Sequence, residues 1–446
     1  MLKLGVIGGG ISGLTLTYKL SQKLQAVGKP YKILLIEKGN RVGGWIKSRN
    51  LSDEGIVWET GPRSLRIAGV PGLKTLKLIQ ELELTDKVIA VGKDSPAAKN
   101  RYLFADGEFN LLPRSLSKMV LNPPKVLKGV AHELIREPFQ AKSTLADESV
   151  EQFLTRRLGP IVGSTLGSAM VRGIYSGDSR TLSMRAAFGS IWQMEQNFGS
   201  ITGGIVNGLV SPSRVDADYE LVKSMKKEIL ESDPRTDSIL NSSMIGFEGG
   251  IETISRAITE KLSEDPNVEF VLNSDCQSIH KSQVDLKNIR VKYSCATEPL
   301  PKFKDFDHVF VAAPSHQASK IIDPRLVTLP DTPWSDVAVV NVSYKHRQDL
   351  KRVIPFEGFG YLVPRSQPSL AIGVVFDSCS FPNLHPHYET LTLMIGKDQM
   401  ANKTKDELIT LSLQCLKEQM NIDREPDLVD ANLNHSCIPL YPVGHV

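Results

Sequence analysis

Cysteine is scarce in this chain, and the cysteines that are present do not pair at short spacing. The 446 residues contain five, at positions 276, 295, 379, 415 and 437, with no C-x-x-C pair. This spacing excludes a dithiol redox motif and a zinc knuckle and favours buried free thiols. His385 and His387 form the only close histidine pair, and the intervening Pro386 disfavours a helix. We therefore expect a solvent loop there and no metal site.

The sequence also lacks a surplus of charge and a long hydrophobic run. The formal net charge of +3 is too small for this length to indicate a nucleic-acid-binding surface. The longest weakly polar stretch, residues 199–210, is too short and too rich in glycine to cross a bilayer. We expect a soluble or monotopic protein, and the length suits two or three domains.

What the sequence does have is a dense group of nucleotide-binding signals in its first 45 residues. The apolar run Leu4–Ile7 leads into Gly8-x-Gly10-x-x-Gly13, and a helical pattern follows. A second apolar run, residues 33–36, ends at Glu37. Strand, glycine turn, helix, strand and acid in this order predict a βαβ unit that binds a dinucleotide.

Each glycine of this turn has its own physical task. Gly8 permits the tight turn out of the strand, Gly10 lets the backbone approach a pyrophosphate, and Gly13 lets the helix pack on the sheet. We expect the pyrophosphate at the helix N-terminus, where free N–H groups and the helix dipole favour an anion. Glu37 is placed to accept hydrogen bonds from ribose hydroxyls.

The segment that follows the acid indicates which dinucleotide is bound. Arg41-Val42-Gly43-Gly44-Trp45 comes directly after the second strand. It resembles the R-x-G-G segment of flavoproteins of the amine oxidase and phytoene desaturase superfamily, where the segment runs along FAD. The sequence therefore favours FAD over NAD.

Residues 110–218 differ in character from what surrounds them. Helical patterns dominate, and apolar residues alternate with cations, namely Arg114, Lys118, Lys125, Lys128, Arg136, Arg156 and Arg157. The stretch 120–128 mixes exposed-looking apolar residues with lysines, which suits an interfacial surface. A solvated helical face explains the same composition nearly as well.

The motifs beyond the nucleotide unit resemble the protoporphyrinogen oxidase family, the FAD enzymes of the penultimate step of haem synthesis, in its eukaryotic type. The resemblance extends over nearly the whole chain. Its carriers are residues 43–46, 61–63, 100–103, 172–178, 358–364, 376–378 and 437–439.

The resemblance implies a mixed α/β fold with three domains. An FAD-binding Rossmann-like domain comprises residues 1–90 and 235–290, a helical membrane-associating domain residues 110–218, and a substrate-binding mixed-sheet domain residues 91–109 and 291–446. We also expect the C-terminal part of the FAD domain to be absent, because members of the family continue beyond the segment that matches residues 441–445. FAD binding is then expected to be weakened or lost.

The resemblance also assigns roles to individual residues. Arg101 pairs with a propionate, which suits a planar guanidinium that can bind a carboxylate bidentately. Other substrate-binding residues are Gly173, Phe359, Leu362 and Met394. Arg63 and Asp377 are the catalytic candidates. Cofactor contacts are assigned to Gly8, Gly9, Gly10, Ile11, Ser12, Gly13, Glu37, Lys38, Arg41, Gly43, Gly44, Trp45, Gly61, Pro62, Arg63, Ser64 and Cys276. From the residue types alone, a surface salt bridge for Arg101 and core packing for Phe359 and Met394 remain open.

The implied reaction removes six electrons from protoporphyrinogen IX in three hydride transfers, with O2 as acceptor and H2O2 as product. The implied setting is peripheral on the mitochondrial inner membrane, often as a homodimer and with ferrochelatase as a possible contact. Two alternatives stay open. One is another flavin oxidase of the superfamily, acting on coproporphyrinogen, an amine or a carotenoid precursor. The other is an inactive chain that binds porphyrin or a partner enzyme.

Overall fold

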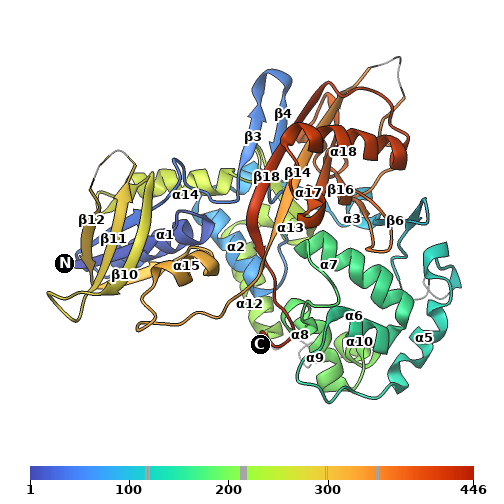
Figure 1. Ribbon diagram of the computed structural model, residues 1–446, viewed down its shortest axis with the longest axis horizontal. Coiled ribbons are helices and arrows are strands. Elements are labelled where there is room, and N and C mark those ends of the chain that lie inside the picture. Colours follow the sequence, from blue (N-terminus) through green and yellow to red (C-terminus); the bar gives the residue numbers. More distant parts are fainter. Residues whose placement is uncertain are drawn as a thin grey trace.

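The computed structural model describes residues 1–446 with the exception of 116, 117, 119, 120, 211–217, 297, 299, 348 and 350. The beginning of the stretch 120–128, and residues 211–217 of the predicted helical region, therefore lie outside the described residues. Three parts are visible in Figure 1: a parallel sheet with its helices, a large mixed sheet, and a group of helices below the large sheet.

The parallel sheet contains the predicted nucleotide unit. Its strand order is β13-β1-β2-β9, and all of these pairings are parallel. The strands are β1 Leu2–Ile7, β2 Tyr31–Ile36, β9 Val268–Val271 and β13 His308–Val311. Helices pack on one face, namely α1 Ile11–Ala26, α2 Gly69–Glu81 and α14 Thr253–Ser263. An antiparallel sheet covers the other face, formed by β10 Ser274–Lys281, β11 Ile289–Cys295 and β12 Lys302–Phe306.

Burial on both faces explains the continuous apolar runs in this sheet. Successive side chains of a strand point to opposite faces. Val6 and Leu35 lie in the core beneath the helices, whereas Ile7 and Leu34 lie in the core beneath the antiparallel sheet. Strands covered on two sides read as unbroken hydrophobic segments.

The pairing of β13 corrects one predicted boundary. Residues 291–446 were assigned together to the substrate domain, yet Leu4 pairs with His308 and Ile7 with Val311. Phe306 of β12 also packs against the parallel sheet. Chain order alone could not show that this strand returns to the nucleotide sheet. β13 is half-buried to exposed, because it lies at the edge of the sheet.

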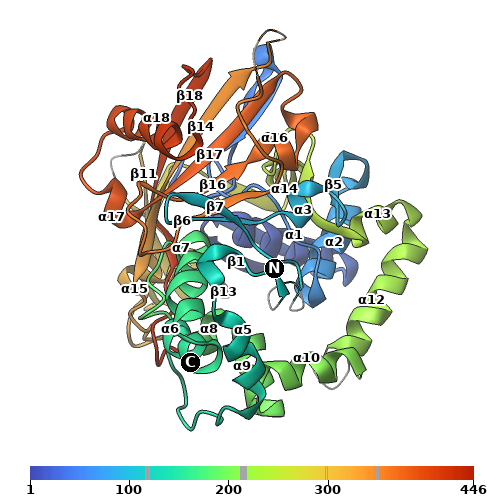
Figure 2. The same cartoon turned by 90° about the vertical axis from the view of Figure 1, so that its right-hand side faces the viewer.

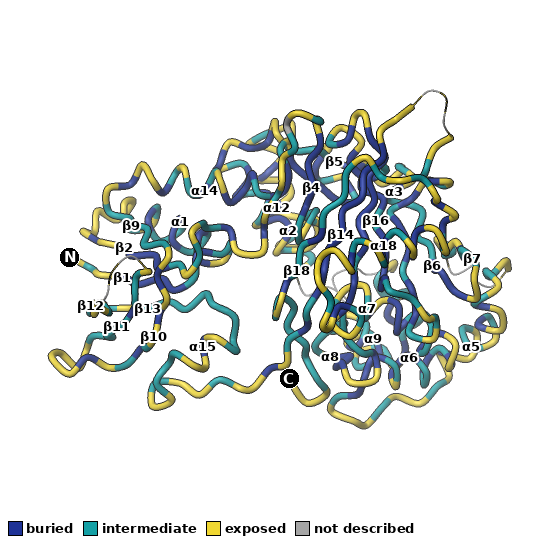
Figure 3. The backbone as a smooth tube through the Cα atoms, turned by 45° about the horizontal axis from the view of Figure 1, so that its top comes forward, coloured by how far each residue is buried: buried dark blue, intermediate teal, exposed yellow. Residues whose placement is uncertain are grey.

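The large sheet has the order β18-β14-β17-β16-β15-β6-β7. Its strands are β6 Tyr102–Ala105, β7 Glu108–Leu111, β14 Trp334–Lys345, β15 Gly360–Leu362, β16 Ala371–Phe376, β17 Tyr388–Gly396 and β18 Leu428–Pro439. Helix α18 (Lys405–Met420) covers one face, where Val340, Leu393 and Leu416 share a core. Figure 3 shows that the buried backbone follows these strands and those of the parallel sheet.

The helical part lies below the large sheet and extends toward the parallel sheet through a long helix (Figures 1 and 2). Its helices are α5 Val130–Arg136, α6 Val150–Leu158, α7 Ser168–Tyr175, α8 Met184–Ala187, α9 Gly189–Phe198, α10 Ile201–Val210 and α12 Tyr219–Ser232, of which α12 contacts α2. Arg157, one of the cations that suggested a surface, is fully buried and paired with Glu137. No helix in the described part of the chain is long and apolar enough to span a membrane.

Shorter elements connect these parts. The strands are β3 Ser48–Leu51, β4 Ile56–Glu59, β5 Val88–Gly92 and β8 Ser242–Phe247. The helices are α3 Pro96–Lys99, α13 Asp237–Leu240, α15 Ser315–Ile321, α16 Asp377–Ser380 and α17 Lys397–Met400. Single 3-10 turns are η1 Ser52–Glu54, η2 Thr85–Lys87, η3 Lys125–Leu127, η4 Glu137–Phe139, η6 Pro234–Thr236 and η7 Pro382–Leu384, and η5 Val162–Gly167 is a short π-helix.

Candidate functional site: a glycine turn beside a polar domain boundary

The glycine turn between β1 and α1 leaves no room for side chains. Gly8 has a φ of +103°, and a Cβ there would lie 3.1 Å from the Ala312 carbonyl carbon. A Cβ on Gly13 would overlap the Gly8 carbonyl oxygen, so the helix is packed directly onto the turn. Gly10 caps α1 without a side-chain hydrogen bond, and Ser12 in the first turn is exposed. The N-terminus of α1 therefore presents backbone N–H groups to an anion.

Glu37 closes the turn from the end of β2. Its Oε2 accepts a hydrogen bond from the Gly9 N–H at 2.6 Å, and its Oε1 accepts one from the Gly39 N–H at 2.7 Å. Each carboxylate oxygen retains a further lone pair for an incoming hydroxyl. Glu37 thus organises the loop in addition to the ribose contact we predicted for it.

The segment 41–45 lies against the glycine turn. The Gly43 N–H donates to the Gly9 carbonyl oxygen at 2.8 Å, and a Cβ on Gly44 would lie 3.0 Å from the Gly10 Cα. Arg41 donates to the carbonyl oxygens of Gly44 at 2.6 Å and Val42 at 2.9 Å. This guanidinium is therefore engaged in folding its own loop.

The other predicted cofactor contacts are spread around this loop. Trp45 is exposed, and a Cβ on Gly61 would lie 2.6 Å from the Trp45 carbonyl oxygen, so residues 61–64 run beside the segment 41–45. Lys38 is exposed and lies 3.5 Å from Asp275. Cys276 shares the core between the parallel and antiparallel sheets with Ile7 and Ile36, which directly precede Gly8 and Glu37, and burial raises the pKa of its thiol to about 12.

Arg63 and Asp377 form an ion pair between the nucleotide unit and the large sheet. Arg63 Nη1 lies 2.5 Å from Asp377 Oδ1, and both side chains are about nine-tenths buried. Asp377 Oδ2 accepts a hydrogen bond from the Thr392 hydroxyl at 2.6 Å. Arg63 Nη2 is buried without a partner among the described residues. A buried guanidinium N–H without an acceptor is costly, so this atom fits a bound group that carries an oxygen or nitrogen acceptor.

Polar groups that we did not predict surround this pair. The Asn341 side-chain amide donates to the Glu59 carbonyl oxygen at 3.1 Å, which joins β14 to the end of β4. Burial raises the pKa of Glu59 to about 7, against hydrogen bonds from the Ile251 N–H and the Ser48 hydroxyl. One sequence signal could have identified Glu59: it is an acid at the end of an apolar strand, two residues before Gly61.

His385 was also placed wrongly by the sequence. We expected a solvent loop, but His385 is only 4% exposed, and its Nδ1 is buried without a partner among the described residues. Burial lowers the pKa of His385 to about 4, and the Arg63 charge acts in the same direction while Asp377 opposes it. The imidazole is therefore neutral at pH 7. Pro386 disfavours a helix at this position, but it does not indicate whether His385 is buried.

Three of the predicted substrate residues lie together on the face of the large sheet opposite α18. Leu362, Gly373 and Met394 form one row across β15, β16 and β17. A Cβ on Gly173 of α7 would overlap the Leu362 side chain. Gly173 and Gly373 carry no side chains, so the half-buried side chains of Leu362 and Met394 form the apolar wall of the site here.

Arg101 and Phe359 form a second contact. The Arg101 guanidinium carbon lies 4.6 Å from the centre of the Phe359 ring. Arg101 Nη1 donates to the carbonyl oxygen of Ala97, and the Phe359 N–H donates to the Asn100 carbonyl oxygen at 3.1 Å. The guanidinium is thus stacked and anchored on one side, which prepares it for a carboxylate on the other.

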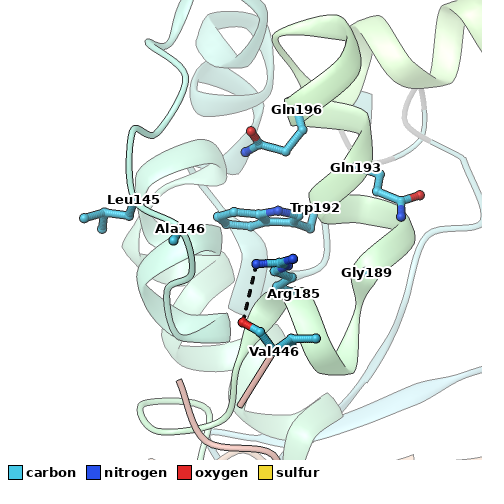
Figure 4. A pocket seen from close by; sticks show the side chains of 8 residues that line it. All are labelled: Leu145, Ala146, Arg185, Gly189, Trp192, Gln193, Gln196 and Val446. Carbon is cyan, nitrogen blue, oxygen red and sulfur yellow. Dashed lines mark hydrogen bonds between the residues drawn. The ribbon is translucent and has the colours of Figure 1, made fainter. Parts of the chain in front are cut away.

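A groove of about 560 Å³ lies in the helical part, away from these residues. Its lining is Leu145, Ala146, Arg185, Gly189, Trp192, Gln193, Gln196 and Val446. Figure 4 shows Arg185 donating to the Val446 carbonyl oxygen. The predicted site residues are not part of this lining, and the groove brings no acid and base together.

Comparison with known proteins agrees with the geometry of the turn. Residues 11–444 match the family of flavin containing amine oxidoreductases. The chain therefore belongs to this family and is a flavin-dependent oxidoreductase, with FAD as its cofactor.

Its relatives within the family include protoporphyrinogen oxidases, as the motifs predicted. The chain is 33% identical to the protoporphyrinogen oxidase of Schizosaccharomyces pombe, over all of this chain and 89% of that protein. It is 31% identical to that of Bos taurus, over 99% of this chain and 88% of that protein. A solved structure from Exiguobacterium sp. 255-15 shares the fold, with a TM-score of 0.75, 20% identity, and coverage of 100% of this chain and 88% of that one.

Proposed function

We propose that this chain oxidises protoporphyrinogen IX to protoporphyrin IX with O2 as acceptor, within haem synthesis. In this reaction six hydrogens leave the macrocycle and three O2 become three H2O2. The observation that carries the proposal is a pair of contacts, Gly173 with Leu362 and Arg101 with Phe359, between residues far apart in sequence. Relatives named protoporphyrinogen oxidase support the same substrate.

The residues divide the work by polarity. Leu362 and Met394 supply an apolar wall for the nonplanar macrocycle, and Gly173, which has no side chain, leaves room in front of that wall. Arg101 supplies the cation for a propionate. Asp377 holds Arg63 so that Arg63 Nη2 keeps a free donor in a buried setting. FAD, when bound along residues 8–13, 37–45 and 61–64, supplies the redox chemistry, and the protein orients the substrate and excludes water.

We further propose peripheral attachment to the mitochondrial inner membrane, with a second copy of the chain and ferrochelatase as partners. Support comes from large apolar side chains exposed on the helical part, notably Leu121 at 83%, Phe139 at 87% and Leu209 at 80%. Lys125 and Arg136 lie on the same segments, and apolar side chains beside cations suit a membrane interface.

The test begins with the absorbance spectrum of the purified chain. With FAD supplied in excess, a bound-flavin spectrum that bleaches on anaerobic addition of protoporphyrinogen IX is the expected result. Flavin that is lost when the excess is removed would match the weakened cofactor binding expected from the sequence. The Arg101→Gln variant should raise KM about tenfold with little change in kcat, because the lost contact is made with bound substrate throughout. Arg101→Lys should lie between the two.

Other outcomes would overturn the proposal in different ways. Faster turnover of coproporphyrinogen than of protoporphyrinogen would indicate another porphyrinogen oxidase. Quenching of porphyrin fluorescence without O2 consumption would indicate a binding protein.

A further inference from the structure

Arg66 is a second cation beside Arg101 that the sequence did not single out. Hydrogen bonds of 2.9 and 2.8 Å join Leu65 to Ile245 of β8 and so fix the position of Arg66 at the edge of that strand. Met244, the neighbour of Ile245, shares a cluster with Phe359, whose ring stacks on Arg101. Arg66 and Arg101 are therefore brought to the same border of the site.

Neither guanidinium has a carboxylate partner in the described part of the chain. The structure records no ion pair for Arg66 or for Arg101, and Arg101 Nη1 is satisfied by backbone carbonyl oxygens of Ala97 and Asn100. Arg114 is different, because it is engaged with the Asn100 side-chain oxygen. Burial and the charge of Arg66 both lower the pKa of Arg101. Two unpaired like charges repel, and an anion between them would remove that cost.

We propose that Arg66 is a second carboxylate-binding residue, so that Arg101 and Arg66 each hold one of the two propionates of the substrate. This inference rests on the proposed function and adds an orientation to it. Arg66 is exposed and Arg101 half-buried, so the propionate edge of the macrocycle faces outward. The edge that carries the apolar substituents faces Leu362 and Met394.

This orientation makes the site selective for a dicarboxylate. The propionates of protoporphyrinogen lie on neighbouring pyrrole rings, whereas coproporphyrinogen carries two more propionates on the opposite rings. Those two would meet the wall of Leu362 and Met394, where a carboxylate loses its hydration without gaining a partner. Arg66 and the apolar wall thus act on opposite ends of the same molecule.

The experiment measures binding of protoporphyrin IX and of its dimethyl ester by fluorescence quenching, which requires no turnover. Arg66→Gln should weaken binding of the free acid about tenfold and leave the ester unchanged, in line with loss of one charge-assisted pair. Arg66→Lys should restore part of the affinity. Lys74→Gln, a loss of the same charge at an exposed position of α2, is the matched control and should change neither ligand.

Two results separate this inference from the proposed function. If Arg66→Gln binds the free acid and the ester as the unaltered chain does, the inference is wrong even where protoporphyrinogen is oxidised. If the unaltered chain neither binds nor oxidises the dicarboxylate, the proposed function fails as well. Circular dichroism of Arg66→Gln should match the unaltered chain, because the side chain is exposed and makes no recorded hydrogen bond.

Discussion

The glycine turn and the boundary around Arg63 and Asp377 are held together by different kinds of contact. In the turn, backbone approaches backbone, and the contacts join residues of the first 44 with one another and with Ala312 directly after β13. At the boundary, side chains from residues 341–394 meet the Glu59 carbonyl oxygen and the side chains of Arg63 and Arg101. Under the proposed function, the first region binds the cofactor shared by the family, and the second region distinguishes one substrate from another. A contiguous motif then indicates the chemistry, and contacts between distant parts of the chain determine the substrate.

The largest effect is expected where the turn has no spare volume. Gly13→Ala places a methyl group on the Gly8 carbonyl oxygen, which is backbone and cannot rotate away. The destabilisation should exceed about 4 kcal/mol, at the extreme of single substitutions. Denaturant unfolding of the purified protein, with flavin retention measured in parallel, checks this.

Gly92→Ala is the matched control for that prediction. A Cβ on Gly92 of β5 meets nothing within 4 Å, so the substitution should leave stability within about 0.5 kcal/mol of the unaltered chain. A soluble Gly13→Ala protein with full flavin content would contradict the close packing of α1 on the turn.

A somewhat smaller effect is expected at the boundary ion pair. Asp377→Ala leaves the Arg63 charge buried without its carboxylate, which should destabilise the protein by about 3–4 kcal/mol. The double variant Arg63→Met, Asp377→Leu should recover most of that loss, because two apolar side chains need no partners. Urea midpoints of the single and double variants provide the measurement.

Turnover of the same double variant separates the role of the ion pair in stability from its role in activity. The double variant is expected to stay folded yet to lose turnover, since it lacks the free donor of Arg63. Equal turnover in the double variant and the unaltered chain would mean that the pair serves stability alone.

The same contrast explains how much could be predicted from the sequence. The βαβ unit was predicted from Gly8 to Glu37 because glycine spacing and apolar runs are local signals, and β1, α1 and β2 appear where expected. The row Leu362, Gly373, Met394 could not be predicted from periodicity, because it depends on the register of three strands. The family resemblance supplied Leu362 and Met394, but not the geometry that joins them to Gly173.

Charge and burial were the least predictable features. Arg157 and His385 look like surface residues in a linear reading, yet both are buried. Arg157 is buried with Glu137 as its ion-pair partner, and His385 is buried in its neutral form, which avoids the larger cost of burying a charge. Partners that lie 20 or more residues away leave no local signal.

The smallest effect expected is a change in pH dependence at Glu59, the residue that touches both regions. Its carboxylate accepts from Ser48 and Ile251 on the nucleotide side, and its carbonyl oxygen accepts from Asn341 of the large sheet. Burial raises its pKa from 4.5 to about 7 in the folded state. Between these values the folded state holds a proton that the unfolded state has lost. Its contribution to stability is therefore complete below pH 4.5 and disappears as pH rises through 7.

Glu59→Gln removes this titration, so the stability difference between variant and unaltered chain should shift by up to about 3 kcal/mol between pH 4.5 and 8, in favour of the variant at high pH. His385 titrates in the opposite sense: its lowered pKa contributes stability above pH 6.5 that is lost as pH falls toward 4. Only the difference between matched unfolding curves therefore isolates Glu59. If the unfolding free energies of Glu59→Gln and the unaltered chain differ by the same amount at every pH, Glu59 is ionised in the folded protein. The two regions then meet around a buried charge and not around a protonated carboxyl group.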